Sequence, residues 1–332
     1  MAVIGSSYVD LVDLYKQQDG KGQYVEIIEM LKEMNPMLED AIAVECNKGT
    51  THLHTVRSGL PDVSWGRLYQ GIPNGKGRTA QVEDTTGFAE GLSTVDTRLL
   101  QLSTNEGAVR LSEAQAHLEA ISQEVQSKMI YGNTASDPEE FMGLAPRFNS
   151  LSAANGNQII DAGGTGSDNT SVWFVTWGDN QCNLLYPKGT MAGVQREDMG
   201  EQRVTDANNN AYYAKEEKFS WHVGLAVKDW RYVSRVANID VSDMNAGSVQ
   251  LYDFMRKAYW KLQNRRVAGG NMAIYCNRDV LEALDALATN AGASDSFVRL
   301  SRTEIEGQEV LSYRGIPLRE TDAILNTEAR VV

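Results

Sequence analysis

The sequence contains little cysteine and no long apolar run. Its three cysteines, Cys46, Cys182 and Cys276, lie far apart and form no CxxC pair, so they indicate neither a disulfide framework nor a zinc knot. No apolar stretch reaches the roughly 18 residues that a membrane span needs, and the N-terminus lacks a basic region followed by an apolar run. The sequence therefore predicts a protein without membrane contact that is made in a reducing cytoplasm and is not exported.

Basic side chains are also in short supply. The 332 residues carry 31 lysines and arginines against 44 aspartates and glutamates, for a formal net charge of -13. Proteins that grip nucleic acid do so with clustered Lys and Arg, which displace counterions from the phosphates. We therefore expect nucleic acid near this protein to be tolerated without being read.

Signatures of catalysis and of cofactor binding are missing as well. Residues 71–77 (GIPNGKG) have glycine where a phosphate loop needs Ser or Thr after its lysine, Lys76, and no amphipathic helix follows. Residues 163–170 are also rich in glycine, but they precede a strand, whereas a dinucleotide-binding turn links strand to helix. His52 and His54 would share one face of a strand without a third metal ligand, and we expect both to face solvent. We predict no catalytic residue, no cofactor and no metal.

Two chemical alternatives stay open at this point. A chain with 44 acidic residues always contains carboxylate pairs, so general acid–base work is unsupported but not excluded. Large aromatic residues can form a platform for a sugar or a base, although scattered ones are more often core or interface residues. These aromatic residues are Trp65, Tyr69, Trp173, Phe174, Trp177, Trp221, Trp230, Tyr259 and Trp260. A soluble enzyme or a carbohydrate-binding protein is therefore an alternative function.

The first third of the chain changes character near residue 50. Residues 1–50 are typical of an arm with two helical patches, the second of which Pro36 should break. Residues 51–101 contain many glycines, two prolines and short β-prone runs, which predict a long β-hairpin with a polar, glycine-rich tip near residues 74–77. Large apolar residues are too few there to form a core layer, so we expect the hairpin to project from the body or to lie on another part of the structure.

The strongest helical pattern spans residues 112–131. Apolar residues recur there at helical spacing, Ser112 stands where an N-cap belongs, and Gly132 stands where a C-terminal glycine belongs. The stretch that follows is rich in Gly, Asn, Ser and Pro, and it predicts a loop with a turn of helix near residues 138–141. A domain junction near residue 150 is plausible.

The second half alternates strand and helix patterns. Predicted strands lie within residues 171–178, 211–229 (two weaker strands), 271–277, 297–302 and 308–322. Predicted helices cover about 246–266 and 278–292. This mixed order favours an α+β layer over a doubly wound parallel sheet.

Five segments in their joint order carry a resemblance to a known family. They are RSGLPDVSWGRLYQGI (57–72), STVDTRL (93–99), IYGNTASDPEEFMGLAPR (130–147), AIYCNRDVLEALDAL (273–287) and YRGIPLRETDAILNTE (313–328). Together they resemble the major capsid proteins of tailed, particularly short-tailed, bacteriophages with the Hong Kong 97 type fold. In order, the segments resemble the ascending arm of the extended loop, its return, the end of the spine helix, and the strand-helix unit and closing β-segment of the axial domain.

The resemblance implies a particular division of an α+β chain. Residues 1–50 would be the N-terminal arm and residues 51–101 the extended loop, a β-hairpin. Residues 102–150 would form the peripheral domain with its long spine helix, which also receives later strands and a helix. Residues 151–332 would be mainly the axial domain.

The resemblance also implies a mechanical function in the virion. The protein would self-assemble, as hexamers and pentamers, into the icosahedral capsid around a double-stranded DNA genome held as non-specific contents. Assembly in the host bacterial cytoplasm, a separate scaffolding protein, a portal and a decoration or cement protein are the expected circumstances, and the shell would be noncovalent. A cellular shell of the encapsulin type, with an enzyme as cargo, is the nearest alternative.

Basic and aromatic side chains of the extended loop are the candidate contacts between subunits. Shell subunits bind copies of themselves through many individually weak contacts that closed symmetry adds together. Arg57, Trp65, Arg67, Lys76 and Arg78 would meet an otherwise acidic partner surface.

Overall fold

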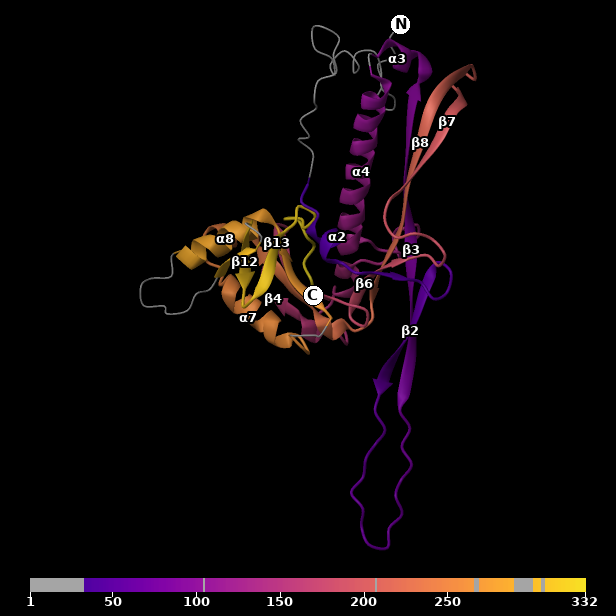
Figure 1. Cartoon of the computed structure of the whole chain (residues 1–332). Helices are drawn as coiled ribbons and strands as arrows, with labels where there is room; N and C mark the ends of the chain where they lie inside the picture. Colours follow the sequence, from indigo (N-terminus) through magenta and orange to yellow (C-terminus); the bar gives the residue numbers. More distant parts are fainter. Residues whose placement is uncertain (1–32, 104, 207, 266–268, 290–300, 306–307) are drawn as a thin grey trace.

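The structure is a computed structural model that describes residues 33–103, 105–206, 208–265, 269–289, 301–305 and 308–332. The molecule is elongated: a long helix and paired strands extend from one side of a rounded body, and a hairpin projects in the opposite direction (Figure 1). The helical patches predicted before residue 33, the helix end predicted at Gly292 and the start of the strand predicted from residue 297 lie outside the described residues.

Strands and helices follow one another along the whole described chain. The strands are β1 (Ala43–Glu45), β2 (Thr51–Gly59), β3 (Arg78–Asp96), β4 (Ile159–Asp161), β5 (Asn169–Trp177), β6 (Cys182–Tyr186), β7 (Gln195–Thr205), β8 (Ala211–Val227), β9 (Val233–Asp240), β10 (Asn271–Cys276), β11 (Ser301–Ile305), β12 (Gln308–Tyr313) and β13 (Ile316–Glu320). The α-helices are α2 (Pro36–Asp40), α3 (Thr97–Leu102), α4 (Glu106–Tyr131), α5 (Leu144–Arg147), α6 (Val241–Asn245), α7 (Leu251–Lys261) and α8 (Arg278–Thr289). Short 3-10 helices cover Gly156–Gln158 and Trp230–Tyr232.

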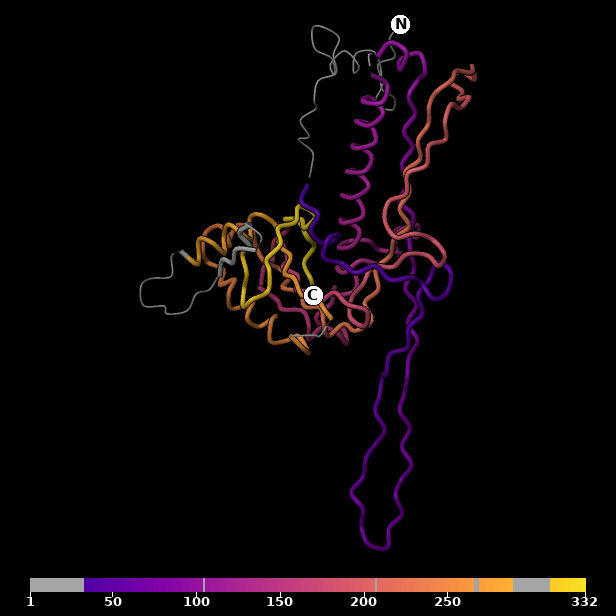
Figure 2. The backbone as a smooth tube through the Cα atoms, viewed as in Figure 1, coloured from indigo at the N-terminus to yellow at the C-terminus, as the bar shows by residue number. Residues whose placement is uncertain are grey.

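The strands join into one continuous network of mixed direction. The main path runs β11-β12-β13-β10-β5-β6-β8-β3-β2. β10 is antiparallel to β5 and parallel to β13, while β9 is antiparallel to β5 and parallel to β4. Such a mixture, with helices packed on it, confirms the predicted α+β class. The predicted domain boundaries remain a prediction. β8 lies between β3 and β7, so strands from distant parts of the sequence are neighbours here (Figure 2).

The central strand β5 is buried along its whole length. Successive side chains of a strand point to opposite faces, and both faces are covered here. Trp173, Val175 and Trp177 enter the core beneath α2 and α4, whereas Val172 and Phe174 enter the core beneath α6, α7 and α8. The apolar run therefore reflects burial on two sides.

A buried ion pair ties the C-terminal segment to the sheet. Arg235 on β9 and Glu328 lie 2.8 Å apart, and both side chains are almost fully buried. Tyr131 and Ser171 donate hydrogen bonds to the same carboxylate at 2.6 and 2.7 Å, and the guanidinium lies 4.8 Å from the Trp173 ring centre. Because its lone pairs are satisfied, this carboxylate tolerates its burial.

The long helix α4 lies along β3 and β8 (Figure 1). The buried ring of Phe219 on β8 stacks on His117 of the helix, with 5.4 Å between ring centres. On β3, a Cβ atom at Gly91 would lie 3.2 Å from Nδ1 of His117. Glycine inside this strand therefore allows the helix to approach closely.

The N-cap of α4 is not the predicted residue, and the glycine after the helix is needed for a different reason than predicted. Asn105, not Ser112, is the N-cap: its side-chain oxygen accepts a hydrogen bond from the Ala108 amide at 3.2 Å. Gly132 does follow the helix, but its φ of -49° needs no glycine. A Cβ atom there would overlap the carbonyl oxygen of Phe141, so close packing of the next loop, rather than a left-handed turn, requires glycine.

One shorter element was predicted wrongly. Residues 138–141 form a turn, in which the Glu140 amide donates to the Asp137 carbonyl at 3.1 Å, and the helical turn α5 comes later. Pro36 fits at the start of α2, because proline lacks only an amide that the first helical position leaves unpaired anyway. The helical patch that it was predicted to break lies mainly outside the described residues.

Two elements of the second half also differ in length. The two weak strands predicted within residues 211–229 form one strand, β8, because β7, β3 and β6 all pair with it and override its polar sequence. The helix predicted from about 246 to 266 is only α7, separated from α6 by Gly247 with φ of 73°. β10 and the start of α8 lie where predicted.

Candidate intermolecular contact surface

The β2–β3 hairpin projects further than any other described element (Figure 2). Its strands pair from Thr51 with Thr85 to Gly59 with Arg78. Residues 60–77 continue beyond this ladder as two arms that meet in a turn, where the Gln70 amide donates to the Arg67 carbonyl at 3.2 Å. We name residues 60–77 the hairpin tip.

The turn of the hairpin lies elsewhere than predicted. Residues 74–77 lie on the returning arm and not at the end of the projection. A Cβ atom at Gly75 would lie 2.9 Å from the carbonyl oxygen of Asp62 on the other arm. Glycine was expected to bend the chain here, but its role is to let the two arms approach.

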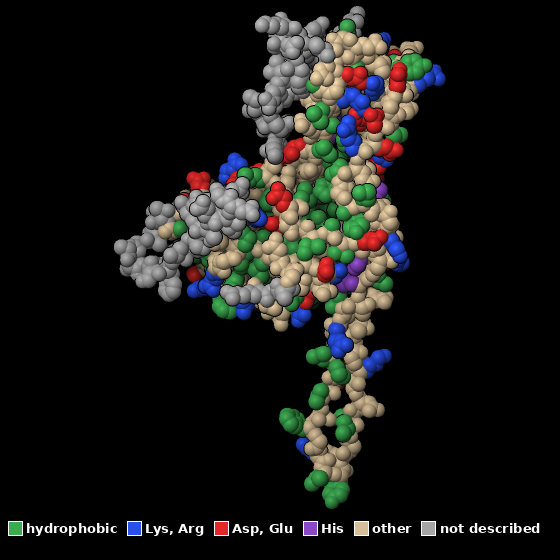
Figure 3. Space-filling view, in the orientation of Figure 1, with side chains coloured by type: hydrophobic (Ala, Val, Ile, Leu, Met, Phe, Trp, Pro, Cys, Tyr) green, Lys and Arg blue, Asp and Glu red, His purple; other side chains and the backbone are tan. Residues whose placement is uncertain are grey.

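The hairpin tip is apolar and not polar as predicted. Trp65 is 98% exposed, and the other large apolar side chains of the tip are nearly as accessible. They are Leu60, Val63, Leu68, Tyr69 and Ile72. A soluble monomer rarely presents so many apolar side chains on one narrow projection, and Figure 3 shows them between basic ones. Prolines and glycines interrupt the spacing of these apolar residues, so the sequence pattern did not predict an apolar tip.

Charge on the hairpin opposes the charge of the rest of the chain. Residues 57–78 contain four basic side chains and one acidic one, a net charge of +3, so the remaining residues carry -13 - 3 = -16. Arg57 and Arg78 lie where the ladder ends, Arg67 lies at the turn, and Lys76 lies on the returning arm. All four are exposed, as is Trp65. The structure thus brings the five predicted contact residues onto one projection.

The root of the hairpin is fixed to the body by a buried ion pair. Asp84 of β3 accepts a hydrogen bond from Arg147 at 2.7 Å, and its side chain is 4% exposed. The same guanidinium donates to the carbonyl oxygens of Met142 and Leu225, at 3.2 and 3.0 Å. Arg147 therefore joins β3, the loop after α4 and β8 at the root of the hairpin.

His52 and His54 also lie at this root, and the expectation that they face solvent was wrong. His52 is 9% exposed, and Nδ1 of His54 lies 3.7 Å from Asp84. Burial lowers the pKa of both imidazoles, and the charge of Lys228 acts in the same direction. Within the part of the chain that the structure describes, no group of three or more His, Cys, Asp or Glu side chains has a geometry for a metal ion.

The cysteines offer no reactive thiol. Cys46, Cys182 and Cys276 are buried and unpaired. Burial raises the pKa of Cys182 and Cys276 to about 12, so both thiols stay protonated.

A second projection, the β7–β8 hairpin, was missed because β7 has no alternation of apolar and polar residues. Arg110 of α4 donates to Asp198 of β7 at 2.7 Å and also pairs with Glu217 of β8. Glu217 is buried and accepts from Arg196 as well, at 2.7 Å. The only signal for this hairpin is its turn, where Asp206 accepts the Asn210 amide at 2.7 Å.

No described helix is both long and apolar enough to cross a membrane.

Comparisons with known proteins show that this chain is similar to bacteriophage capsid proteins. The family model for the major capsid protein GP7 matches residues 19–332. Among solved structures, a chain of bacteriophage epsilon15 is 38% identical, with a TM-score of 0.76 over 100% of this chain and 99% of that chain. A capsid chain of bacteriophage JBD30 is 9% identical, with a TM-score of 0.48 over 79% of this chain and 85% of that chain. The SrpI encapsulin of Synechococcus elongatus PCC 7942 is 11% identical, with a TM-score of 0.44 over 66% of this chain and 91% of that chain. Both similarities are too distant to support an argument about function. No curated protein matches the sequence.

Proposed function

The chain belongs to the family of the major capsid protein GP7, and we propose that each copy contacts its neighbour in the shell through the β2–β3 hairpin. Membership makes the protein a subunit of the icosahedral capsid of a tailed phage, with the Hong Kong 97 type fold, that assembles with copies of itself. The hairpin assignment is finer than this, and it concerns which residues make the contact.

The exposed apolar tip is the observation that carries the proposal. Fully burying a large apolar side chain stabilises by about 1.5–3 kcal/mol, so the six of the hairpin tip represent about 10 kcal/mol that a lone subunit leaves unused. Association and ordering consume much of this gross figure. What remains is a weak contact per copy, as a shell that corrects its own errors needs.

The five predicted residues have distinct parts in this contact. Trp65 supplies the large apolar anchor near the turn, and such aromatic anchors dominate interface energies. Arg57, Arg67, Lys76 and Arg78 lie on the same projection and favour a neighbour's acidic surface, because outside the hairpin segment the chain carries the net charge of -16 derived above. Electrostatic attraction of this kind orients the encounter and selects the partner face.

The proposal includes the circumstances of assembly. Copies would form hexamers and pentamers in the host bacterial cytoplasm, with a separate scaffolding protein, a portal and a decoration protein as partners, and the packaged DNA would be non-specific contents. The protein would act without catalysis. The protonated cysteines and the position of the phosphate-loop look-alike on an exposed hairpin arm support this. The family match favours this function over a cellular shell, a carbohydrate-binding protein or an enzyme.

A short deletion tests the hairpin assignment. Replacing residues 60–77 by Asn-Gly would close the ladder at its last pair, Gly59 with Arg78, with a two-residue turn that suits a hairpin. A longer deletion to residue 90 would also remove the part of β3 that pairs with β8. We expect soluble subunits with an unchanged melting temperature and no shells by electron microscopy.

Charge reversal provides a milder version of the same test. Arg67→Glu should lower particle yield, whereas Arg330→Glu, an equally exposed control near the C-terminus, should not. Wild-type particle yield from the deletion variant would overturn the hairpin assignment without touching family membership.

A further inference from the structure

The far end of α7 carries a basic and aromatic patch that the hairpin contact does not use. Trp260 is 59% exposed. The guanidinium of Arg265 lies 4.4 Å from the Trp260 ring centre, and that of Arg314 lies 5.1 Å from the ring centre of Tyr259 and 5.9 Å from that of Trp260. Lys261 is exposed beside them. We name Tyr259, Trp260, Lys261, Arg265 and Arg314 the α7 patch.

Backbone strain marks the same patch. Arg314 has φ of 54° and Gly315 has φ of 79°, in the turn between β12 and β13. A two-residue turn with both angles positive favours Asn-Gly or Gly-Gly, so arginine is a costly choice at its first position. Residues held in such unfavourable backbone conformations cluster at functional sites. Here the strained residue places its guanidinium over the exposed rings.

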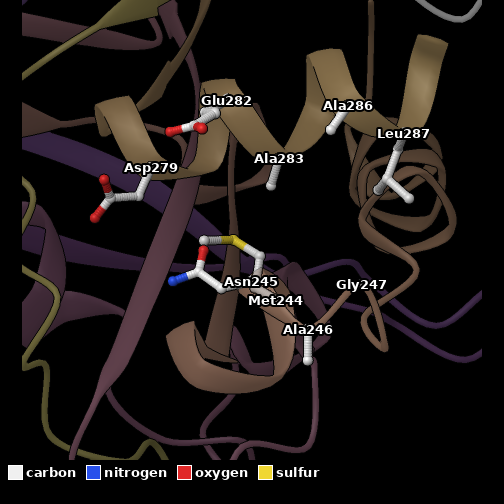
Figure 4. Close-up of a pocket in the computed structure, with 9 residues that line it drawn as sticks. All are labelled: Met244, Asn245, Ala246, Gly247, Asp279, Glu282, Ala283, Ala286 and Leu287. Carbon is white, nitrogen blue, oxygen red and sulfur yellow. The ribbon is translucent and has the colours of Figure 1, made fainter. Parts of the chain in front are cut away.

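A groove of about 610 Å³ lies between α6 and α8 on the same domain (Figure 4). Most of the side chains that line it are small or apolar, with Met244 and Ala246 on the α6 side and Ala283 and Ala286 on α8. Asp279 and Glu282 lie together at one end, and none of the lining residues is basic. A groove lined mainly by small side chains, with carboxylates at one end, can admit an aromatic ring flanked by guanidinium groups.

One chain does not place its α7 patch in its own groove. The Tyr252 hydroxyl, in the first turn of α7, donates to the Leu284 carbonyl of α8 at 2.8 Å. Trp260 comes eight residues later, about 12 Å further along the helix axis. The patch and the groove therefore lie at separate places on one domain, and two different surfaces that fit each other generate head-to-tail rings.

We propose that, in the shell, the groove between α6 and α8 of one copy receives Trp260 of the adjacent copy, with Arg265 and Arg314 paired to Asp279 and Glu282. The occupant is a second copy because the charges are complementary within one sequence and this family builds closed shells from copies of one chain. The inference rests on shell assembly but not on the hairpin contact.

Oxidative footprinting of the wild-type protein tests both contacts at once. Hydroxyl-radical labelling of Trp260 and Trp65 is compared between free subunits and assembled shells, with mass spectrometry as the readout. We expect Trp260 labelling to fall at least tenfold in shells. Protection of Trp260 but not Trp65 would keep this inference and overturn the hairpin proposal. Protection of Trp65 alone would do the reverse.

A charge swap then identifies the groove as the partner. Arg265→Glu and Glu282→Arg should each lower particle yield at least tenfold, and the double variant should recover to within about threefold of wild type. Glu139→Arg, an exposed acid far from the groove in sequence, is the control for reversal alone. Single variants that fold and assemble normally, or a folded double variant that fails to recover, would overturn the pairing.

A steric variant covers the case in which a charge swap disturbs folding. Ala286→Trp fills the groove from the exposed side of α8 without changing any charge. It should leave the melting temperature within a few degrees of wild type and still reduce particle yield. Normal yield with the groove filled would equally overturn the inference.

Discussion

The two hairpins of this protein differ in what supports them. The β7–β8 hairpin lies against α4, where Arg110 links Asp198 and the buried Glu217. Beyond its last paired residues the β2–β3 hairpin has no partner element among the described residues, and its largest side chain, Trp65, is almost fully exposed. One hairpin is thus completed within its own chain. The other exposes apolar side chains that only another molecule can bury.

The difference predicts opposite responses to mutation. Changes in the supported hairpin should lower the free energy of unfolding of the subunit, and changes in the hairpin tip should spare the subunit and affect assembly. The four predictions below are ordered by their effect on the unfolding free energy. Each is measured by urea unfolding of unassembled subunits, with particle yield by electron microscopy as the second readout.

Arg110→Met should have the largest effect. It leaves the carboxylate of Glu217 buried with Arg196 as its remaining ionic partner among the described residues, and breaking a buried pair costs about 3 kcal/mol or more. The double variant Arg110→Met/Glu217→Leu should recover part of this loss, because no buried charge remains. A loss below the uncertainty of the measurement would show that the β7–β8 hairpin is not held by this network.

Removing the N-cap of α4 should cost less. Asn105→Ala deletes the side-chain acceptor for the Ala108 amide, and losing such a cap costs about 1 kcal/mol. Ser112→Ala is the matched control, because Ser112 lies inside the helix and caps nothing. Equal losses in the two variants would contradict the observed helix start.

The pair Asn105 and Ser112 shows what the sequence predicted and what it did not. Helical spacing correctly predicted α4 and its end, but an internal serine resembles a cap until the preceding turn is seen to continue the helix. β5 was predicted from its apolar run because burial on both faces leaves a local signature. β7 leaves none, since its partner strands and α4 decide its structure.

The contact surface, too, was predicted only in part from the sequence. Its place on the chain followed from glycine content and from the resemblance, and the structure brings the five predicted residues onto the hairpin. The apolar tip was missed, because exposure is a property of the fold and not of the residue type. The burial of His52 and His54 was missed for the same reason.

Acid pH should weaken the root of the projecting hairpin. Burial lowers the pKa of His54 from its ordinary 6.5, and the nearby charges of Lys228 and Arg147 act in the same direction against the attraction of Asp84. The unfolded chain therefore binds protons at a higher pH than the folded chain does. Stability is complete above pH 6.5 and falls as the pH drops below it, toward the lowered pKa.

Replacing the histidine should flatten this pH dependence. His54→Gln removes one of the two buried imidazoles, so the unfolding free energy should fall less between pH 7 and pH 5 than in the wild type. His222→Gln, which removes a histidine of β8, is the control for the loss of an imidazole. Equal slopes for His54→Gln and wild type would mean that other groups cause the acid sensitivity.

Trp65→Ser should have the smallest effect on the subunit and a large one on the shell. A side chain that is 98% exposed loses no packing when it is shortened, and surface substitutions of this kind usually change stability by less than about 0.5 kcal/mol. In the shell the same change removes an aromatic anchor from every copy of the contact, so particle yield should fall although the melting curve does not move. Trp230→Ser, also at the surface but on the body, is the control that separates loss of a tryptophan from loss of this one. If both variants assembled normally, the exposed tip would be left without a partner, and the contrast between the two hairpins would reduce to a difference in packing within one chain.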